Sequence, residues 1–162
     1  MKFSIVKPDL LKPLSHIYSV VERKNTIPIL SNLVIEAKDN KVSFTATDME
    51  IDIVEEIFVN VITPGKLTVS AHTLYDIVRK LPEGSEILIN LDEINLTISC
   101  GKSKFRLPTL PVDDYPIMNE IVGGKNFSIS SADLQNLIDN TKFAISLEET
   151  RYYLNGIYLH QA

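Results

Sequence analysis

The chain has 162 residues, of which 44% are hydrophobic and 23% are charged, a globular composition that excludes a disordered or collagen-like chain. The single cysteine, Cys100, excludes an intrachain disulfide and a Cys-rich zinc or iron–sulfur site. No apolar run approaches the roughly 18 residues of a membrane span, and the first residues do not resemble a signal peptide. We therefore expect a soluble, cytoplasmic protein.

The charge of the chain is unevenly distributed. Sixteen basic and 21 acidic residues give a net charge of −5, which by itself argues against a protein that binds nucleic acid. The segment 7–24, however, has a balance of +2, and the segment 72–80 has a balance of +1. All other residues together carry −8, so the positive charge is concentrated in two segments.

The first half of the chain alternates between strand and helix patterns. Alternation predicts a strand at 2–6, and apolar residues at helical spacing predict a helix that ends near Val21. Pro13 lies inside this helix, so we expect either a kink or a start nearer Pro13 than Pro8. Stretches rich in β-branched residues then predict strands of one antiparallel sheet at 32–37, 41–47, 51–61 and 66–70.

The second half begins with another helix. Ser70 is predicted to cap a short helix that runs to Leu81 and is stopped by Pro82. The segment 113–125, which contains Pro116 and a pair of glycines, is typical of a linker. Between the helix and the linker, alternation predicts three more strands at 86–91, 94–99 and 104–107.

The sequence repeats itself at a constant offset of 124 residues, with no gap. The tripeptide Phe-Ser-Ile at 3–5 recurs at 127–129, and the Asp-Leu pair at 9–10 recurs at 133–134. Shared apolar periodicity is the competing explanation, but the matching Ser, Asp and Thr positions favour a true repeat. We therefore expect an α+β fold in which 1–122 form a complete domain. The remainder, 123–162, would be a linker and the truncated start of a second copy.

No group of residues in the sequence predicts catalysis. Met49, Ile51 and Ile53 alternate with three acidic residues that would suit a divalent cation or an acid–base pair: Asp48, Glu50 and Asp52. The simpler interpretation is a strand with the apolar residues buried and the carboxylates facing solvent. The three histidines are too widely spaced for a metal site. We expect no catalytic residue, no bound metal and no cofactor.

The two basic segments coincide with the two predicted helices, which is the pattern of a phosphate-facing surface, although many surface helices also carry lysine and arginine. The run Arg151-Tyr152-Tyr153 is more unusual. Adjacent tyrosines beside an arginine can stack on bases or receive the apolar side chain of a peptide. The alternative is that one ring belongs to the core and the other is partly exposed.

Taken together, these features closely resemble the bacterial DNA polymerase III β subunit family, the replicative sliding clamps. The resemblance covers the whole chain and is carried by the repeat and by five blocks, TIPILSN at 26–32, TDME at 47–50, LPEG at 81–84, LP at 110–111 and RYYLNG at 151–156. It implies three copies of one domain, each with two helices packed on antiparallel sheets. It further implies that two chains close head to tail into a ring that encircles duplex DNA and tethers the polymerase without catalysing a reaction. A chain of this length would be a fragment unable to close that ring.

The resemblance also implies roles for individual residues. Lys24 matches a position of the family that contacts DNA, whereas Glu148 places a carboxylate at another such position and would repel phosphate. The further residues expected to face DNA are Arg23, Lys12, Arg79, Tyr152 and Tyr153.

Two protein-binding surfaces follow from the same resemblance. Phe105 and Leu107, flanked by Lys102 and Lys104, match the edge that pairs with the other protomer of the head-to-tail dimer. Short apolar peptide motifs of polymerases and of the clamp loader would bind a cleft of which this chain holds only the near wall, with Arg151, Tyr152, Tyr153 and Leu154.

Two hypotheses from other functional classes remain open. A metal-dependent hydrolase would use Asp48, Glu50 and Asp52 and would be stabilised by divalent ions. A protein-interaction module without a DNA function would bind peptides and show no salt-sensitive affinity for DNA.

Overall fold

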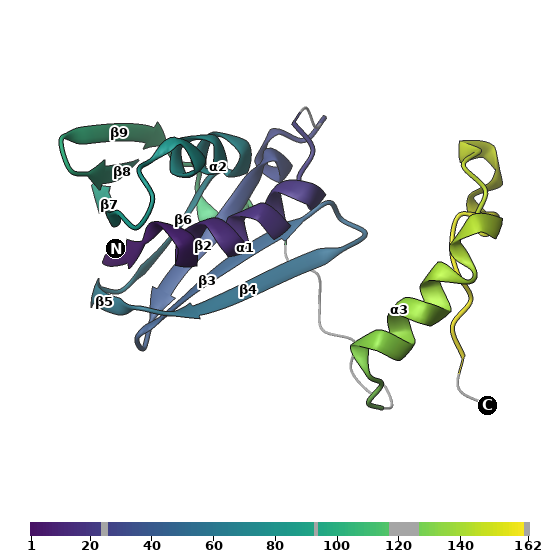
Figure 1. Cartoon of the computed structure of the whole chain (residues 1–162). Helices are drawn as coiled ribbons and strands as arrows, with labels where there is room; N and C mark the ends of the chain where they lie inside the picture. The colour runs from purple at the N-terminus through teal and green to yellow at the C-terminus, as the bar shows by residue number, and fades with distance from the viewer. Residues whose placement is uncertain (24–25, 93, 117–126, 161–162) are drawn as a thin grey trace. The chain divides into compact units, whose positions relative to one another are not determined.

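The computed structural model describes residues 1–23, 26–92, 94–116 and 127–160 (Figure 1). The chain forms two compact units, Met1–Asn119 and Glu120–Ala162. The strands of the first unit are β1 (Lys2–Val6), β2 (Asn32–Lys38), β3 (Lys41–Thr47), β4 (Asp52–Phe58), β5 (Asn60–Thr63), β6 (Gly65–Ser70), β7 (Glu86–Asp92), β8 (Asn95–Cys100) and β9 (Ser103–Pro108).

These strands form two antiparallel sheets, with the orders β5-β1-β7-β8-β9 and β4-β3-β2-β6. The prediction of antiparallel strands is confirmed, but the prediction of one sheet for 32–70 is wrong. The stretch 51–61 contains two strands, β4 and β5, which belong to different sheets. Val59 separates them and donates its backbone N–H to the Asn40 carbonyl at 3.0 Å, where the chain crosses from one sheet to the other.

Two helices lie side by side on one face of the β4-β3-β2-β6 sheet, α1 (Lys7–Val20) and α2 (Ala71–Lys80) (Figure 1). Helix α1 begins at Lys7, with Pro8 in the first turn, where a missing N–H leaves no hydrogen bond unmade. Of the two alternatives predicted for Pro13, a kink or a later start, the start nearer Pro13 is therefore wrong, because α1 continues through Pro13. The Ser70 cap is confirmed, since its hydroxyl accepts the Thr73 N–H. In the part of the chain that the structure describes, no helix is long and apolar enough to span a bilayer.

Both helices and both sheets contribute to one hydrophobic core. Leu10, Leu14 and Ile17 recur at helical spacing along α1, and each is at most 1% exposed. Leu74 and Val78 form the corresponding buried stripe on α2. Because each helix turns its apolar side to the sheets, its polar residues are left on the opposite side, facing solvent.

Lys7 is an exception among the basic residues, because it is buried. Its exposed fraction is 2%, and its Nζ donates to the Leu81 carbonyl at 2.7 Å and pairs with Glu83 at 2.5 Å. The Lys7 backbone N–H donates to the Ser85 carbonyl at 2.9 Å. The start of α1 is thereby attached to the loop that follows α2, and one charge of the basic segment 7–24 is removed from the surface.

Tyr115 attaches the end of the first unit to the other face of the β4-β3-β2-β6 sheet. Its ring is 4% exposed and clusters with Ile29 and Val34. Its hydroxyl accepts the Thr47 N–H at 3.2 Å and donates to the Asn32 carbonyl at 3.1 Å. Burial raises the pKa of Tyr115. The predicted linker at 113–125 is wrong at its start, and residues 117–125 lie outside the described residues.

The second unit begins its helix at the position that the repeat predicts. Helix α3 (Ser131–Asp139) starts 124 residues after the start of α1, and the Ser130 hydroxyl caps it by accepting the Asp133 N–H at 3.1 Å. Two short 3₁₀ helices follow, η3 (Lys142–Ala144) and η4 (Glu149–Leu154). Residues 127–129 match residues 3–5 of β1 in sequence but form no strand.

The buried lysine gives a stability prediction. Lys7→Met should lower the free energy of unfolding by about 1–3 kcal/mol, because the Leu81 carbonyl loses its donor in a buried position. Lys12→Met, at an exposed position of the same helix, should change it by no more than about 0.5 kcal/mol. Urea unfolding of the 162-residue chain measures both, and equal effects would contradict the structural role of Lys7.

Tyr115 gives a second prediction, which depends on pH. Tyr115→Phe should destabilise the chain by about 1–3 kcal/mol at neutral pH, because two buried backbone groups lose their partner. The folded state retains the Tyr115 proton above pH 10, where an unfolded tyrosine releases it, so this stability is complete below about pH 10 and falls above it. The difference in free energy of unfolding between the unaltered chain and Tyr115→Phe should therefore become smaller as pH rises past 10. A constant difference in urea unfolding would contradict this.

Candidate functional site

The exposed sides of α1 and α2 carry the basic residues that the sequence predicts to face DNA. Lys12 lies in the middle of α1, Arg23 lies just beyond its end, and Arg79 is in the last turn of α2; all three are exposed. Helix α1 packs against α2, and we call the exposed sides of these two helices the helix-pair surface. Lys24 lies outside the described residues.

Arg23 is held by a tyrosine of α1. Its Nη2 donates to the Tyr18 hydroxyl at 2.7 Å, and its guanidinium carbon lies 5.7 Å from the centroid of the Tyr18 ring. The hydrogen bond to Tyr18 raises the pKa of Arg23. The hydrogen-bond partner of Arg23 is therefore neutral, and the nearby Asp76 carboxylate makes only a smaller contribution to the raised pKa.

The Tyr18 ring also contacts two aromatic side chains of α2. It lies 4.5 Å from the Tyr75 ring and 4.6 Å from the His72 ring, measured between centroids. The Arg79 guanidinium lies 5.6 Å from the Tyr75 centroid and pairs with Asp76 at 3.1 Å. These tyrosines are not among the predicted site residues. The available signal was the four-residue helical spacing from Tyr75 to Arg79. Arg23 lies beyond the end of α1, so no such spacing pointed to its contact with Tyr18.

Strand β9 forms a free edge of the β5-β1-β7-β8-β9 sheet. Phe105 and Leu107 are half-buried and pack against the core, whereas Lys104 and the unpredicted Arg106 alternate with them and are exposed. Lys102 lies in the turn before the strand. An edge with unpaired backbone groups, apolar residues on one face and cations on the other is suited to pairing with another chain.

In the second unit, η4 brings Arg151, Tyr152, Tyr153 and Leu154 together. The two tyrosine rings lie edge to face at 5.7 Å and are 80% and 71% exposed, so neither ring is buried among the described residues. The Arg151 Nε pairs with the Glu148 carboxylate at 3.0 Å. The carboxylate at the expected DNA-contact position is therefore partly neutralised by its neighbour.

The acidic triplet does not form one face of a strand. Asp48 lies in a turn, where its Oδ1 accepts the N–H groups of Glu50 at 2.9 Å and Ile51 at 2.7 Å. Those two donors lower the pKa of Asp48. Met49 has a φ of 77° and is 52% exposed, and Ile51 is 54% exposed, so the expected burial of both is wrong. Among the described residues, no group of three His, Cys, Asp or Glu could hold a metal ion.

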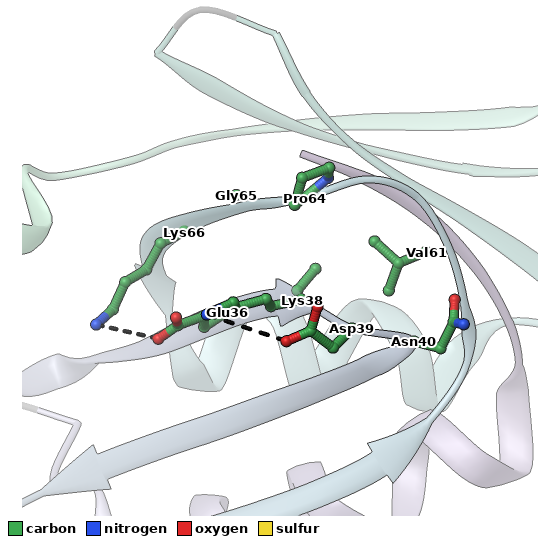
Figure 2. Close-up of a pocket in the computed structure, with 9 residues that line it drawn as sticks. Glu36, Lys38, Asp39, Asn40, Val61, Pro64, Gly65 and Lys66 are labelled. Carbon is green, nitrogen blue, oxygen red and sulfur yellow. Dashed lines mark ion pairs between the residues drawn. The ribbon is translucent and has the colours of Figure 1, made fainter.

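A hollow of about 480 Å³ lies between the β2–β3 turn and the β5–β6 turn (Figure 2). Its lysines are paired with its own carboxylates, Lys66 with Glu36 at 3.2 Å and Lys38 with Asp39 at 4.0 Å. Such paired surface charges provide neither a nucleophile nor an acid–base couple, so the hollow is not a candidate active site.

Comparison with known proteins shows the family of the chain. A family model described as DNA polymerase III beta subunit, N-terminal domain, matches residues 1–119. The beta sliding clamp of Caulobacter vibrioides is 48% identical over 162 residues, covering 99% of this chain and 44% of the relative. The beta sliding clamp of Escherichia coli is 37% identical over 158 residues, covering 97% of this chain and 43% of the relative.

Solved structures give the same result. The Caulobacter crescentus pol III beta structure matches with a TM-score of 0.94 and 49% identity, covering 99% of this chain and 43% of that chain. The sliding clamp of Bartonella birtlesii matches with a TM-score of 0.95 and 46% identity, with 99% and 43% covered. The fold is that of a sliding clamp. The chain belongs to the DNA polymerase III beta subunit family, and it spans less than half the length of these relatives.

The Asp48 turn gives a prediction that also tests the hypothesis of a metal-dependent hydrolase. Asp48→Ala should lower the free energy of unfolding by about 0.5–1.5 kcal/mol, and Asp48→Asn should lower it less, because the amide oxygen still accepts both N–H groups. Since its pKa is lowered, Asp48 contributes stability above its ordinary pKa, and this contribution is lost as pH falls through the lowered value. Mg²⁺ or Mn²⁺ should leave the melting temperature unchanged; a rise that Asp48→Asn abolishes would favour a metal site.

Proposed function

We propose that this chain contributes the first domain and the start of the second to a ring-shaped sliding clamp. The ring encircles duplex DNA in the cytoplasm without reading its sequence, and it acts as a processivity factor for the replicative polymerase. The clamp has no catalytic role of its own. Enclosure turns repeated encounters between polymerase and template into one long binding event, so affinity for a particular site is not required.

One observation carries this proposal. In a chain with a net charge of −5, the helix-pair surface carries the exposed Lys12, Arg23 and Arg79. A basic surface on an otherwise acidic protein attracts phosphates on that side and disfavours them elsewhere. Lys24 is assigned to the same surface by the family resemblance alone.

The protein partners follow from two other surfaces. We assign the β9 edge, with Phe105, Leu107, Lys102 and Lys104, to head-to-tail pairing with a second full-length copy. We assign Arg151, Tyr152 and Leu154 to the near wall of a cleft for short apolar peptides of the polymerase and the clamp loader. Tyr152 and Tyr153 are exposed enough to contact DNA bases as well. A module that binds only proteins would need none of the cations on the helix-pair surface.

A salt series tests the DNA assignment. The 162-residue chain should bind a short duplex of mixed sequence no tighter than roughly 10⁻⁴–10⁻⁶ M, and more weakly as salt rises. Arg79→Ala and Lys24→Ala should each weaken binding and reduce the log–log salt slope by about one. Glu148→Gln should strengthen binding, because it removes a carboxylate and frees Arg151. Fluorescence anisotropy of a labelled duplex measures all of these.

Lys38→Ala is the matched control, since Lys38 is exposed on β2, far in sequence from both helices, and should leave the salt slope unchanged. Equal effects of Lys38→Ala and Arg79→Ala would mean that DNA binds to no particular face. Binding that is insensitive to salt, or absent at low salt, would contradict the proposed function.

A further inference from the structure

Four side chains form a continuous row across the helix-pair surface, in the order Arg23, Tyr18, Tyr75 and Arg79. We propose that Tyr18 and Tyr75 are positioning residues that hold the two guanidinium groups at a fixed spacing for phosphate contact. This inference rests on the proposed function and adds to it the side chains that preorganise the DNA-facing cations. We call this row the Arg–Tyr row.

The contacts of the row are continuous from one helix to the other. Arg23 donates to the Tyr18 hydroxyl at 2.7 Å, the Tyr18 and Tyr75 centroids are 4.5 Å apart, and the Arg79 guanidinium lies 5.6 Å from the Tyr75 centroid. The Arg23 guanidinium carbon also lies 5.7 Å from the Tyr18 centroid, so both arginines are within the range of a cation–π contact. Each guanidinium is therefore held by a ring that the other helix supports.

Tyr18 is itself held on a second side. The His72 ring meets it edge-on at an interplanar angle of 80°, and the His72 Nε2 lies 2.7 Å from the Val21 carbonyl at the end of α1. Tyr18 is half-buried, so its ring is fixed by packing while its hydroxyl is available to Arg23. A long exposed arginine would otherwise lose much of its rotamer freedom on contacting a phosphate.

The two tyrosines differ in a way that provides a matched control. The Tyr18 hydroxyl accepts a hydrogen bond from Arg23, whereas the Tyr75 hydroxyl forms no hydrogen bond with any residue that the structure describes. Tyr75 acts through its ring alone, which contacts both Tyr18 and Arg79. Removing the Tyr18 hydroxyl should therefore weaken DNA binding, and removing the Tyr75 hydroxyl should not.

The test compares variants of the 162-residue chain in the same salt series on a labelled duplex. Tyr18→Phe should weaken binding about two- to fivefold with an unchanged salt slope, because a contact is lost but no charge. Tyr75→Phe should have no effect. Tyr75→Leu should weaken binding to a similar extent, because Arg79 loses the ring that it contacts, and it should also leave the salt slope unchanged.

A double-mutant cycle separates positioning from packing. In an Arg23→Ala background, Tyr18→Phe should cause no further loss of affinity, because its effect acts through Arg23. The Arg23 Nη–H that donates to Tyr18 should also exchange with solvent faster in Tyr18→Phe than in the unaltered chain, as measured by NMR without DNA. That second readout does not depend on DNA binding.

The possible outcomes are distinct. Salt-sensitive binding that Tyr18→Phe leaves unchanged, or a loss that persists in the Arg23→Ala background, overturns the positioning role and leaves the proposed function standing. Unchanged exchange of the Arg23 Nη–H likewise overturns the positioning role. Absence of salt-sensitive binding by the unaltered chain overturns the proposed function and the inference together.

Discussion

Burial of the apolar stripe of α1 is the constraint on which the rest of the first unit depends. Leu10, Leu14 and Ile17 enter a core that both sheets and α2 share, so the rotation of α1 about its own axis is fixed. At about 25 cal/mol per Å² of apolar surface, three such side chains contribute several kcal/mol, more than any exposed ion pair of the molecule. With that rotation fixed, every other residue of α1 has a determined direction.

The surface chemistry follows from this rotation. Lys7, at the start of α1, lies on the protein side, and its charge is satisfied by the Leu81 carbonyl and Glu83. Lys12 lies on the solvent side of the same helix. Two lysines five residues apart therefore have opposite roles, one stabilising the fold and one contributing to the electrostatic field of the surface. A count of charges along the sequence treats them as equal.

Sequence patterns predicted most elements but not how they are arranged. Alternation located the strands because one face of each is buried, yet it continued through Val59, where the chain leaves one sheet for the other. Periodicity records burial and not the identity of the partner strand. At Asp48, hydrogen bonds between side chain and backbone hold a turn between two predicted strands, as is common for aspartate, so the three carboxylates do not share one strand face. The Arg–Tyr row was not predicted, because the helix–helix contact that assembles it is a tertiary feature.

The partners of the arginines bear on how a sliding contact can work. Arg79 and Arg151 form ion pairs with Asp76 and Glu148, which reduces the field that each presents, whereas the hydrogen-bond partner of Arg23 is the neutral Tyr18 and Asp76 acts on Arg23 only through a smaller Coulomb attraction. In the proposed ring, DNA is retained by enclosure, so strong phosphate contacts would only slow the movement of the ring along DNA. Each phosphate contact adds about 0.9 to the salt slope, so a few full charges among compensated ones would keep binding weak and exchangeable. Preorganisation by tyrosine positions a cation without cancelling it, which a carboxylate cannot do.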